Sequence, residues 1–407
     1  MTQLRTVQVL GGGSAGSSAH VRSLAAGLVA RGVRVTVCAP AELDHDYDFL
    51  GAGAQFVPVP RRSDPLSVGA LRAACAGADV VHAHGLNAAV RAALALAAQH
   101  VPLVVTWHTR SHAEGARRQV LRLLERKAVR AAAVVLGTSS ELVDRARRRG
   151  ARDARLGPVS LPGLAGLLPG RRGVAAGGAF DAESGAGSGS GFGMDSGLGS
   201  GVGSGSDAAG GAGSDAGSDA EEKARAELGA VDRPLIMTVG PLEPHRGHDT
   251  LLDASRQWLG HDPVPLVAVA GEGQGRGALQ RRIDTEELPV RLLGHRDDVG
   301  ALLAAADVAV LPSRWEARAP LAQEALRLGV PLVATAVGGV PELVGDAAEL
   351  VPYGDAVALA HAVTGLLGDP VRRAALAEAG RRQARTWPTE DDTIAQVLSV
   401  YDELCGR

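Results

Sequence analysis

Two acidic residues in the second half of the chain, Glu316 and Glu324, have the types and the spacing to bind a hydroxyl-rich ligand. They stand eight residues apart in the run WEARAPLAQEALRLGVPLVATAVGGVPE, which follows a short apolar strand at Val308–Leu311. Glu316 closes the loop after this strand, and Glu324 lies one turn into the helix predicted next. Both carboxylates are expected to face one cleft near the positive end of that helix. Because an ionised carboxylate accepts two or more O–H hydrogen bonds, the pair suits sugars and riboses.

Histidines stand at the ends of apolar runs in the first half of the chain. His108 follows the run LVVT in TWHTRSH, and His82 and His84 end another run in VVHAHG. Sites of α/β proteins cluster at the carboxyl ends of parallel strands, so two neighbouring strand ends that carry histidine make His108 a candidate site residue. No carboxylate or cysteine is spaced to complete a metal site, and no metal is expected.

A glycine-rich loop, LGGGSAGSSAHV, follows the first apolar run of the chain. Its residues Gly11, Gly13 and Gly16 satisfy the G-x-G-x-x-G pattern. In dinucleotide-binding proteins that pattern is completed by an acid at the end of the second strand. Here the second strand ends in VCAP with no acid before Glu42, which argues against a nicotinamide oxidoreductase. The glycines still allow backbone N–H groups to approach a ligand closely.

Short runs rich in valine, leucine and alanine recur along the chain and alternate with amphipathic segments. Such runs between turn residues are typical of buried parallel strands. In the first half they are Val7–Leu10, Val33–Val37, Phe56–Val59, Val80–His82, Leu103–Thr106 and Val134–Leu136. In the second half they are Leu235–Val239, Leu266–Ala270, Val290–Leu293, Val308–Leu311, Pro331–Ala334 and Ala348–Val351. The alternation predicts two doubly wound α/β domains.

The domain limits follow from length and composition. The chain has 407 residues, more than one core normally holds, and 45% of them are hydrophobic. Residues 171–219 are mostly Gly, Ser, Ala and Asp, which cannot bury enough surface to order themselves, so a disordered linker is predicted there. The first domain is then 1–170, the second is 220–388, and 389–407 form a helix expected to return to the first domain. A cleft at the carboxyl ends of both sheets would bind the ligand.

Bulk properties exclude several classes of protein. The net charge of -3 lacks the signature of a nucleic-acid-binding protein, and the three cysteines show no disulfide or zinc spacing. The N-terminus lacks a signal-peptide pattern, and no apolar run reaches the roughly 18 residues of a membrane span. A cytoplasmic protein is expected. The basic segment 110–130 is either a solvated helix face or a peripheral contact with the inner face of the cell membrane.

Taken together, the motifs resemble those of a known family, the retaining glycosyltransferases of family four, which have the GT-B fold. In the second half the likeness rests on VGPLEPHRG, VAGEGQGRGALQ, VRLLGHRDDV and AADVAVLPSRWEARAPLAQEAL, and the family's signature is two glutamates with seven residues between them. In the first half AGSSAHVRSLAAGLVARGVRVTV, DVVHAHG, TWHT and GTSSEL match in order. The likeness covers nearly everything except the low-complexity insertion.

The resemblance implies a hexosyltransferase that takes a nucleotide-diphosphate-sugar as donor substrate, with retention of the anomeric configuration and with no metal or further cofactor. The acceptor, whether a small molecule, a glycan or a lipid-linked molecule, stays open. Two other readings also stay open, a non-catalytic nucleotide-sugar-binding relative and a GT-B nucleotide-sugar epimerase.

The resemblance also implies roles for individual residues. Glu316 would bind hydroxyls of the donor sugar, Glu324 would accept the ribose hydroxyls, and His108 would touch the sugar near the reacting face. The remaining donor-binding residues implied in this way are Gly16 and Arg246 at the diphosphate, Ala319 through its backbone N–H, and Gly294 and His295 near the base.

One position departs from the family's pattern. Pro241 stands where the family usually places an arginine that binds the diphosphate. Arg318 replaces a common apolar residue, and we hypothesise that Arg318 or Arg314 supplies the lost charge. The departure is also what motivates the reading of a non-catalytic relative.

Overall fold

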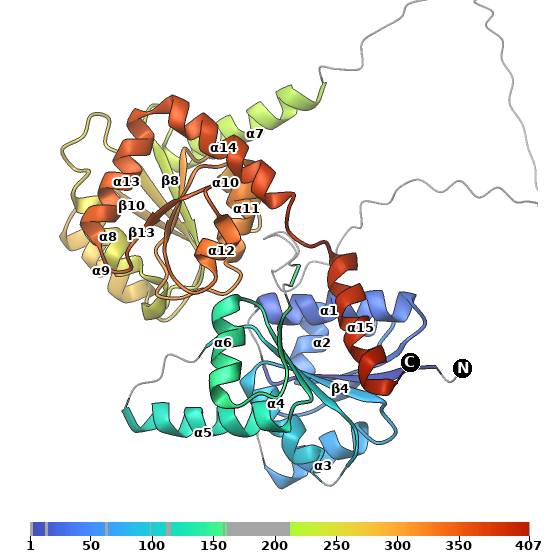
Figure 1. Ribbon diagram of the computed structural model, residues 1–407. Helices are drawn as coiled ribbons and strands as arrows, with labels where there is room; N and C mark the ends of the chain where they lie inside the picture. Colours follow the sequence, from blue (N-terminus) through green and yellow to red (C-terminus); the bar gives the residue numbers. More distant parts are fainter. Residues whose placement is uncertain are drawn as a thin grey trace, which may run out of the picture.

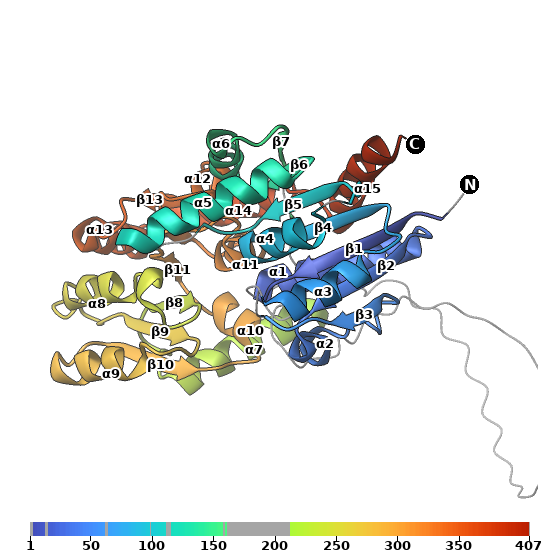
Figure 2. The same cartoon turned by 90° about the horizontal axis from the view of Figure 1, so that it is seen from below.

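The protein consists of two α/β units that lie side by side (Figures 1 and 2). The computed structural model describes residues 3–12, 15–61, 64–97, 99–110, 115–157, 159–160 and 212–406, with no side chains for 15 and 212–218. The predicted disordered segment 171–219 lies outside the described residues as far as 211. Residues 212–219 are instead helical, because they extend α7 (Ala212–Leu228) outward from Ala224 and Leu228, which pack in a core.

The N-terminal unit is built on a seven-stranded parallel sheet in the order β3-β2-β1-β4-β5-β6-β7. Its strands are β1 (Arg5–Leu10), β2 (Arg34–Ala39), β3 (Gln55–Pro58), β4 (Val80–His84), β5 (Leu103–Trp107), β6 (Val134–Gly137) and β7 (Ala154–Leu156). The order runs outward in both directions from β1 and β4, which is the switch point where doubly wound sheets bind ligands. The strand β7 was not predicted, because its three residues, ARL, carry too little apolar pattern.

Alternate side chains of these strands belong to two different cores. One face packs against α3 (Pro65–Ala74), α4 (Leu86–Ala95), α5 (Gly115–Ala131) and α6 (Ser140–Arg149). The other face packs against α1 (Ala15–Ala30), α2 (Ala41–Tyr47) and the C-terminal helix α15 (Glu390–Cys405). The strands are therefore buried on both sides, which explains their almost continuous apolar sequence.

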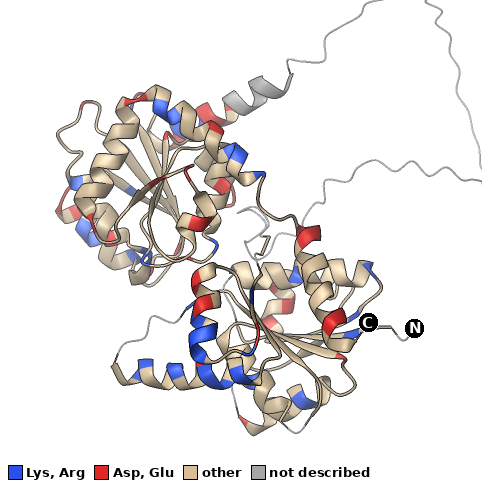
Figure 3. Ribbon diagram, in the orientation of Figure 1, with Lys and Arg blue, Asp and Glu red and all other residues tan. Residues whose placement is uncertain are grey.

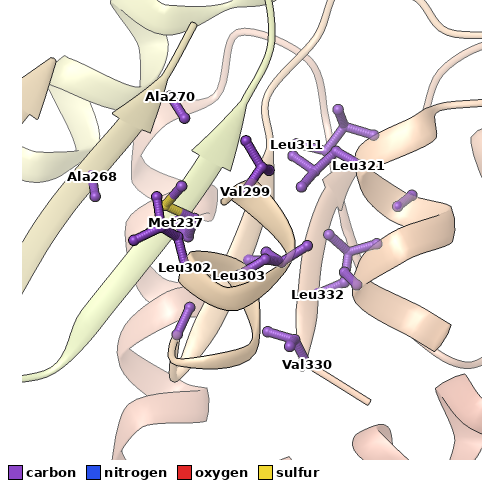
Figure 4. Close-up of a cluster of buried hydrophobic side chains, with 14 of the residues drawn as sticks. Met237, Ala268, Ala270, Val299, Leu302, Leu303, Leu311, Leu321, Val330 and Leu332 are labelled. Atoms are coloured by element: carbon purple, nitrogen blue, oxygen red, sulfur yellow. The ribbon is translucent and has the colours of Figure 1, made fainter. Parts of the chain in front are cut away.

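The C-terminal unit has a six-stranded parallel sheet in the order β10-β9-β8-β11-β12-β13. Its strands are β8 (Leu235–Val239), β9 (Leu266–Ala270), β10 (Val290–Gly294), β11 (Val308–Leu311), β12 (Leu332–Thr335) and β13 (Glu349–Val351). One face packs against α7, α10 (Val299–Ala304), α11 (Pro320–Leu328) and α12 (Val340–Val344). Figure 4 shows Met237 of β8 in this core, with Leu302 and Leu303 of α10.

The opposite face of the second sheet is covered by α8 (His248–Arg256), α9 (Arg276–Thr285) and α13 (Ala356–Gly368). After α14 (Pro370–Ala384) the chain leaves this unit, and α15 packs against α1 of the N-terminal unit (Figure 1). Thr389 caps α15 in a reciprocal hydrogen-bonded pair with Asp392. The buried side chains Ile394, Val397 and Tyr401 hold the helix there, so the last residues of the chain complete the core of the first unit.

Candidate functional site

A cavity of about 740 Å³ lies between the two units. Its N-terminal wall comes from Gly16 and Ser17 of α1, residues 108–110 after β5, and Thr138 after β6. Its C-terminal wall comes from the loops that follow β8, β9, β10 and β11. The cavity is thus bordered by the carboxyl ends of both sheets, where parallel α/β proteins bind their ligands.

Glu316 lies on the C-terminal wall of this cavity and is only 8% exposed. Its carboxylate accepts a hydrogen bond from the Ser313 hydroxyl at 2.9 Å and forms an ion pair with Arg246. Arg246 ends a short 3₁₀ turn, Pro244–Arg246, and also lines the cavity. The predicted sugar-binding acid and the predicted phosphate-binding cation are therefore in direct contact.

The loop that carries Glu316 is held by the paired glycines of the run GGVPE. Gly338 has φ +57, and a Cβ there would lie 2.0 Å from the carbonyl oxygen of Glu316. Gly339 donates its N–H to that same oxygen at 2.8 Å. Only glycine permits this close approach, so the downstream glycines position the upstream acid.

The N-terminus of α11 forms the adjoining part of the wall. Ala319 precedes the helix with φ 30 and ψ 80, an unusual left-handed conformation for a residue with a Cβ. The side chain of Gln323 donates to the carbonyl oxygen of Arg318, and the N–H of Gln323 donates to that of Ala319 at 3.1 Å. Strained backbone of this kind, held by its surroundings, is a feature of ligand-binding sites.

Arg318 presents an incompletely paired cation to the cavity. Its Nε and Nη2 atoms are buried and have no hydrogen-bond partner within the described part of the chain. Burial lowers the pKa of Arg318 to about 10, although the nearby carboxylate of Glu342 opposes the shift. Pro241 lines the same cavity, whereas Arg314 does not. Because buried guanidinium nitrogens without partners are costly, the site favours an anionic ligand.

Two predicted site residues do not line the cavity with the others. Gly294 lies next to His295, which does, and its carbonyl oxygen accepts the N–H of Gly271 at 2.8 Å. Glu324 pairs with Arg327 at 3.7 Å and lies one turn up α11, whereas the cavity reaches only the first residues of the helix, Pro320 and Leu321. We predicted that both glutamates face one cleft; Glu316 is among the residues that line this cavity and Glu324 is not, and the binding roles of both stay predictions.

His108 lies on the N-terminal wall and belongs to a cluster of four histidines. Its ring centroid is 5.5 Å from that of His20 and 5.7 Å from that of His84, and the rings of His82 and His84 stack at 4.3 Å. Burial is the main cause that lowers the pKa of His82 to about 3 and that of His108 to about 4. These rings are therefore neutral near pH 7.

The structure also shows contacts between the units that the sequence did not predict. The indole N–H of Trp315 donates to Glu141 of α6 at 2.6 Å, and the guanidinium of Arg110 lies 5.8 Å from the centre of the Trp315 ring. Glu342 accepts the backbone N–H of Ser140 at 3.0 Å. Trp315 is the immediate neighbour of Glu316, so this interface helps to position the loop of the site. The sequence offered one indication of these contacts, namely that the residues lie next to the predicted site loops.

In the described part of the chain, no three His, Cys, Asp or Glu side chains are grouped so that they could hold a metal ion.

Two family models match the chain. Residues 15–162 match the model of a glycosyl transferase 4-like domain, and residues 219–383 match that of glycosyl transferases group 1. The chain belongs to the GT-B glycosyltransferases of family four. The two matches fall on the two units that border the cavity.

Curated relatives of this glycosyltransferase chain match it over part of their length. It is 32% identical over 188 residues to a GDP-mannose-dependent monoacylated alpha-(1-6)-phosphatidylinositol monomannoside mannosyltransferase of Corynebacterium glutamicum, with 43% of this chain and 49% of the relative covered. It is 35% identical over 201 residues to a D-inositol 3-phosphate glycosyltransferase of Salinispora tropica, with 45% and 41% covered. The chain therefore spans about half the length of these relatives.

Solved structures share the fold of the whole glycosyltransferase chain. Anabaena HepE in complex with UDP superimposes with a TM-score of 0.73 at 18% identity, covering 99% of this chain and 100% of that one. Sucrose-phosphate synthase from Thermosynechococcus elongatus gives a TM-score of 0.71 at 20% identity, with the same coverage of 99% and 100%. At such identities the likeness establishes the GT-B fold, which was predicted correctly.

Proposed function

We propose that this protein transfers a sugar from a nucleotide-diphosphate-sugar to a hydroxyl group of an acceptor, with retention of the anomeric configuration. The observation that carries the proposal is the composition of the interdomain cavity. One wall holds the Arg246–Glu316 ion pair and the incompletely paired Arg318, and the other holds His108. Cations for a diphosphate and polar groups for a sugar thus meet in one site.

The diphosphate would bind at the N-terminus of α11. Partial positive charge gathers at a helix N-terminus, and two cations line the same cavity, Arg318 and the Glu316-paired Arg246. During transfer the nucleoside diphosphate leaves with additional negative charge, which these groups would stabilise without a metal. Arg318 then supplies the cation that Pro241 does not.

The donor sugar would lie between Glu316 and His108. The carboxylate of Glu316 has acceptor capacity beyond Ser313 and Arg246, and the neutral ring of His108 has one nitrogen for a sugar hydroxyl. In this reading the acceptor oxygen attacks from the face that the diphosphate leaves, so retention needs no protein nucleophile. Anomeric analysis of the product by NMR would test retention.

The acceptor is proposed to enter from the N-terminal unit. Two curated relatives are named for acceptors that contain inositol, namely D-inositol 3-phosphate and a phosphatidylinositol mannoside. A polyol phosphate, free or lipid-linked, is therefore the first acceptor class to assay.

A peripheral membrane contact is a second proposal, carried by α5. This helix exposes Val120 at 56% and Leu123 at 63% among basic residues, and Figure 3 shows positive charge along α5 and α6. No helix in the described part of the chain is long and apolar enough to span a bilayer. Pelleting with anionic vesicles at low salt tests the contact, and absence of binding there would exclude it.

Thermal unfolding against UDP, GDP, ADP and their sugars is the first test of the donor site. A ligand at a hundredfold excess over its Kd stabilises the folded state by about 2.7 kcal/mol, so the correct nucleotide should be visible as a raised Tm. Failure of every nucleotide to shift the Tm would contradict a donor site in this cavity.

Turnover separates the enzyme from its alternatives. Release of nucleoside diphosphate should require acceptor and should fall roughly 100-fold in Glu316→Gln, the loss expected when a charged group that stabilises the transition state is removed. Glu378→Gln, at an exposed residue of α14 paired with Arg382, is the matched control. Binding without release would indicate a non-catalytic relative, and a changed sugar nucleotide without acceptor would indicate an epimerase.

A further inference from the structure

We infer that a row of buried polar side chains, from Tyr401 of the C-terminal helix through Gln8 and His84, sets which nitrogen of His108 carries the proton, with the orientation of the Gln8 amide giving the row its direction. His108 would thereby present a hydrogen-bond acceptor to the cavity. The inference rests on the proposed function only for the consequence, namely that His108 touches the donor sugar. The proton arrangement itself is a property of the fold.

A continuous row of polar side chains leads from the cavity to α15. His108 Nε2 lies 3.4 Å from His84 Nδ1, and His84 Nε2 lies 2.9 Å from Gln8 Oε1. Gln8 Nε2 lies 3.0 Å from the Tyr401 hydroxyl, which is 2.7 Å from His82 Nδ1. Each member except His108 is at most 3% exposed, so water cannot substitute for a missing partner.

The row occupies one face of the sheet because side chains alternate along a strand. Gln8 of β1, His84 of β4 and Thr106 of β5 all lie on the face covered by α1 and α15, and His108 follows Thr106 with the same parity. The opposite parity carries apolar residues. A polar row in this apolar layer is stable only if every member is paired.

Donor and acceptor roles along the row follow from the amide of Gln8. Its Oε1 can only accept, so His84 must carry its proton on Nε2. The buried ring of His84 is neutral, because burial lowers its pKa well below 6.5, and its Nδ1 is therefore an acceptor. His108 must then donate from Nε2, which leaves its Nδ1 as the acceptor for a ligand hydroxyl.

Tyr401 continues the row in the same direction at the other end, as a hydroxyl that can both accept and donate. Its hydroxyl oxygen accepts from Gln8 Nε2, so its own proton goes to His82 Nδ1. His82 in turn donates from Nε2 to the Thr106 hydroxyl at 2.7 Å. If the Gln8 amide were turned around, the donor and acceptor of every hydrogen bond in the row would exchange roles, and His108 Nδ1 would become a donor. Tyr401 thus belongs to the row that positions the proton of His108, although it lies 393 positions away from Gln8 in the sequence.

The experiment is a long-range ¹H–¹⁵N correlation spectrum of the histidine-labelled full chain near neutral pH. The expected result is that His84 and His108 both carry the proton on Nε2. Protonation of His84 on Nδ1 would overturn the inference. This measurement needs no variant, ligand or activity, so it remains decisive even if no donor is ever turned over.

Tyr401→Phe removes the hydroxyl and keeps the ring. We expect mixed tautomers of His84 and His108, and a kcat lowered about 10-fold with the KM for the donor within twofold, since orientation is lost more than binding. Val400→Ala, in the same helix without a polar contact, should lower the Tm but leave tautomers and kcat unchanged. Wild-type tautomers in Tyr401→Phe would overturn the inference. A wild-type protein with the expected tautomers but no turnover would count against the proposed function alone.

Discussion

Some side chains of the site destabilise the ligand-free protein but are placed to bind a ligand. Arg318 keeps two guanidinium nitrogens buried without partners, although a neutral side chain would pack there at lower cost. Such a residue is expected where a ligand supplies the missing partners. The cluster of four histidines also has a cost to stability, because its rings are held neutral inside an apolar layer.

Arg318→Leu should bind the nucleotide-sugar about 10- to 100-fold more weakly, which is the range for losing a charge-assisted hydrogen bond. In the ligand-free state the same variant should be about 1 kcal/mol more stable, because an unpaired buried charge is removed. Calorimetric titration and urea unfolding measure the two effects. Arg314→Leu, in the same loop but outside the cavity lining, should leave donor affinity unchanged. Equal affinities of wild type and Arg318→Leu would exclude compensation for Pro241 by Arg318.

Stability should fall in acid because the buried histidines resist protonation. The pKa of His82 is about 3, whereas the ordinary value is 6.5. Between these values the unfolded chain binds a proton that the folded ring does not, so stability is complete above pH 6.5 and decreases as the pH falls. Each such ring contributes at most about 1.4 kcal/mol per pH unit. Half-buried His108 contributes less, because the cavity admits water.

Urea unfolding at a series of pH values between about 7.5 and 5 measures this slope. His82→Asn should be less stable at neutral pH but should show a shallower dependence on pH. An unchanged slope in this variant would contradict the assignment.

At the scale of elements, the helices α1 and α15 pack closely against each other. A Cβ on Gly27 of α1 would lie 2.0 Å from Cδ1 of Ile394, so the two helices approach as closely as glycine allows. Ile394 is 4% exposed and anchors α15 to the first unit. The position of Tyr401 in the polar row depends on this contact.

Gly27→Ala should destabilise the protein by about 1–3 kcal/mol through overpacking, and Ile394→Ala by about 2–4 kcal/mol through a cavity. The double variant should lose less than the sum, because the shortened side chain leaves room for the new methyl group. Gly69→Ala is the control, since nothing lies within 4 Å of its Cβ in α3. It should gain up to about 1 kcal/mol in helix propensity. Strict additivity of Gly27→Ala and Ile394→Ala would show that the helices are separated in solution.

The whole molecule depends on how the two units meet at the cavity. Trp315 of the second unit hydrogen-bonds to Glu141 of the first, and Arg110 pairs with the same carboxylate at 2.9 Å. This group of three residues joins the unit that carries His108 to the loop that carries Glu316.

Glu141→Ala should raise the KM for the donor several-fold with little change in Tm, because the loop loses its partner across the interface while each core stays intact. Steady-state kinetics and small-angle scattering with and without the nucleotide measure the effect. Asp144→Ala on the same helix, where Asp144 pairs with Arg147, is the control. Identical kinetics in Glu141→Ala and wild type would show that the interface does not position the site.

Local pattern was sufficient for most of the strands and for part of the cavity lining. Apolar runs between turn residues marked every strand except β7, because burial on both faces of a parallel sheet leaves a strong one-dimensional signal. His108, directly after β5, and Glu316, in the loop after β11, line the cavity for the same reason, and their roles stay predictions. Their contacts were not predicted, since Gln8 and Tyr401, or Glu141 and Trp315, meet only when distant surfaces pack. Whether Glu324 lines the cavity likewise depends on how far the cavity extends along α11. The spacing of residues along the chain does not determine this.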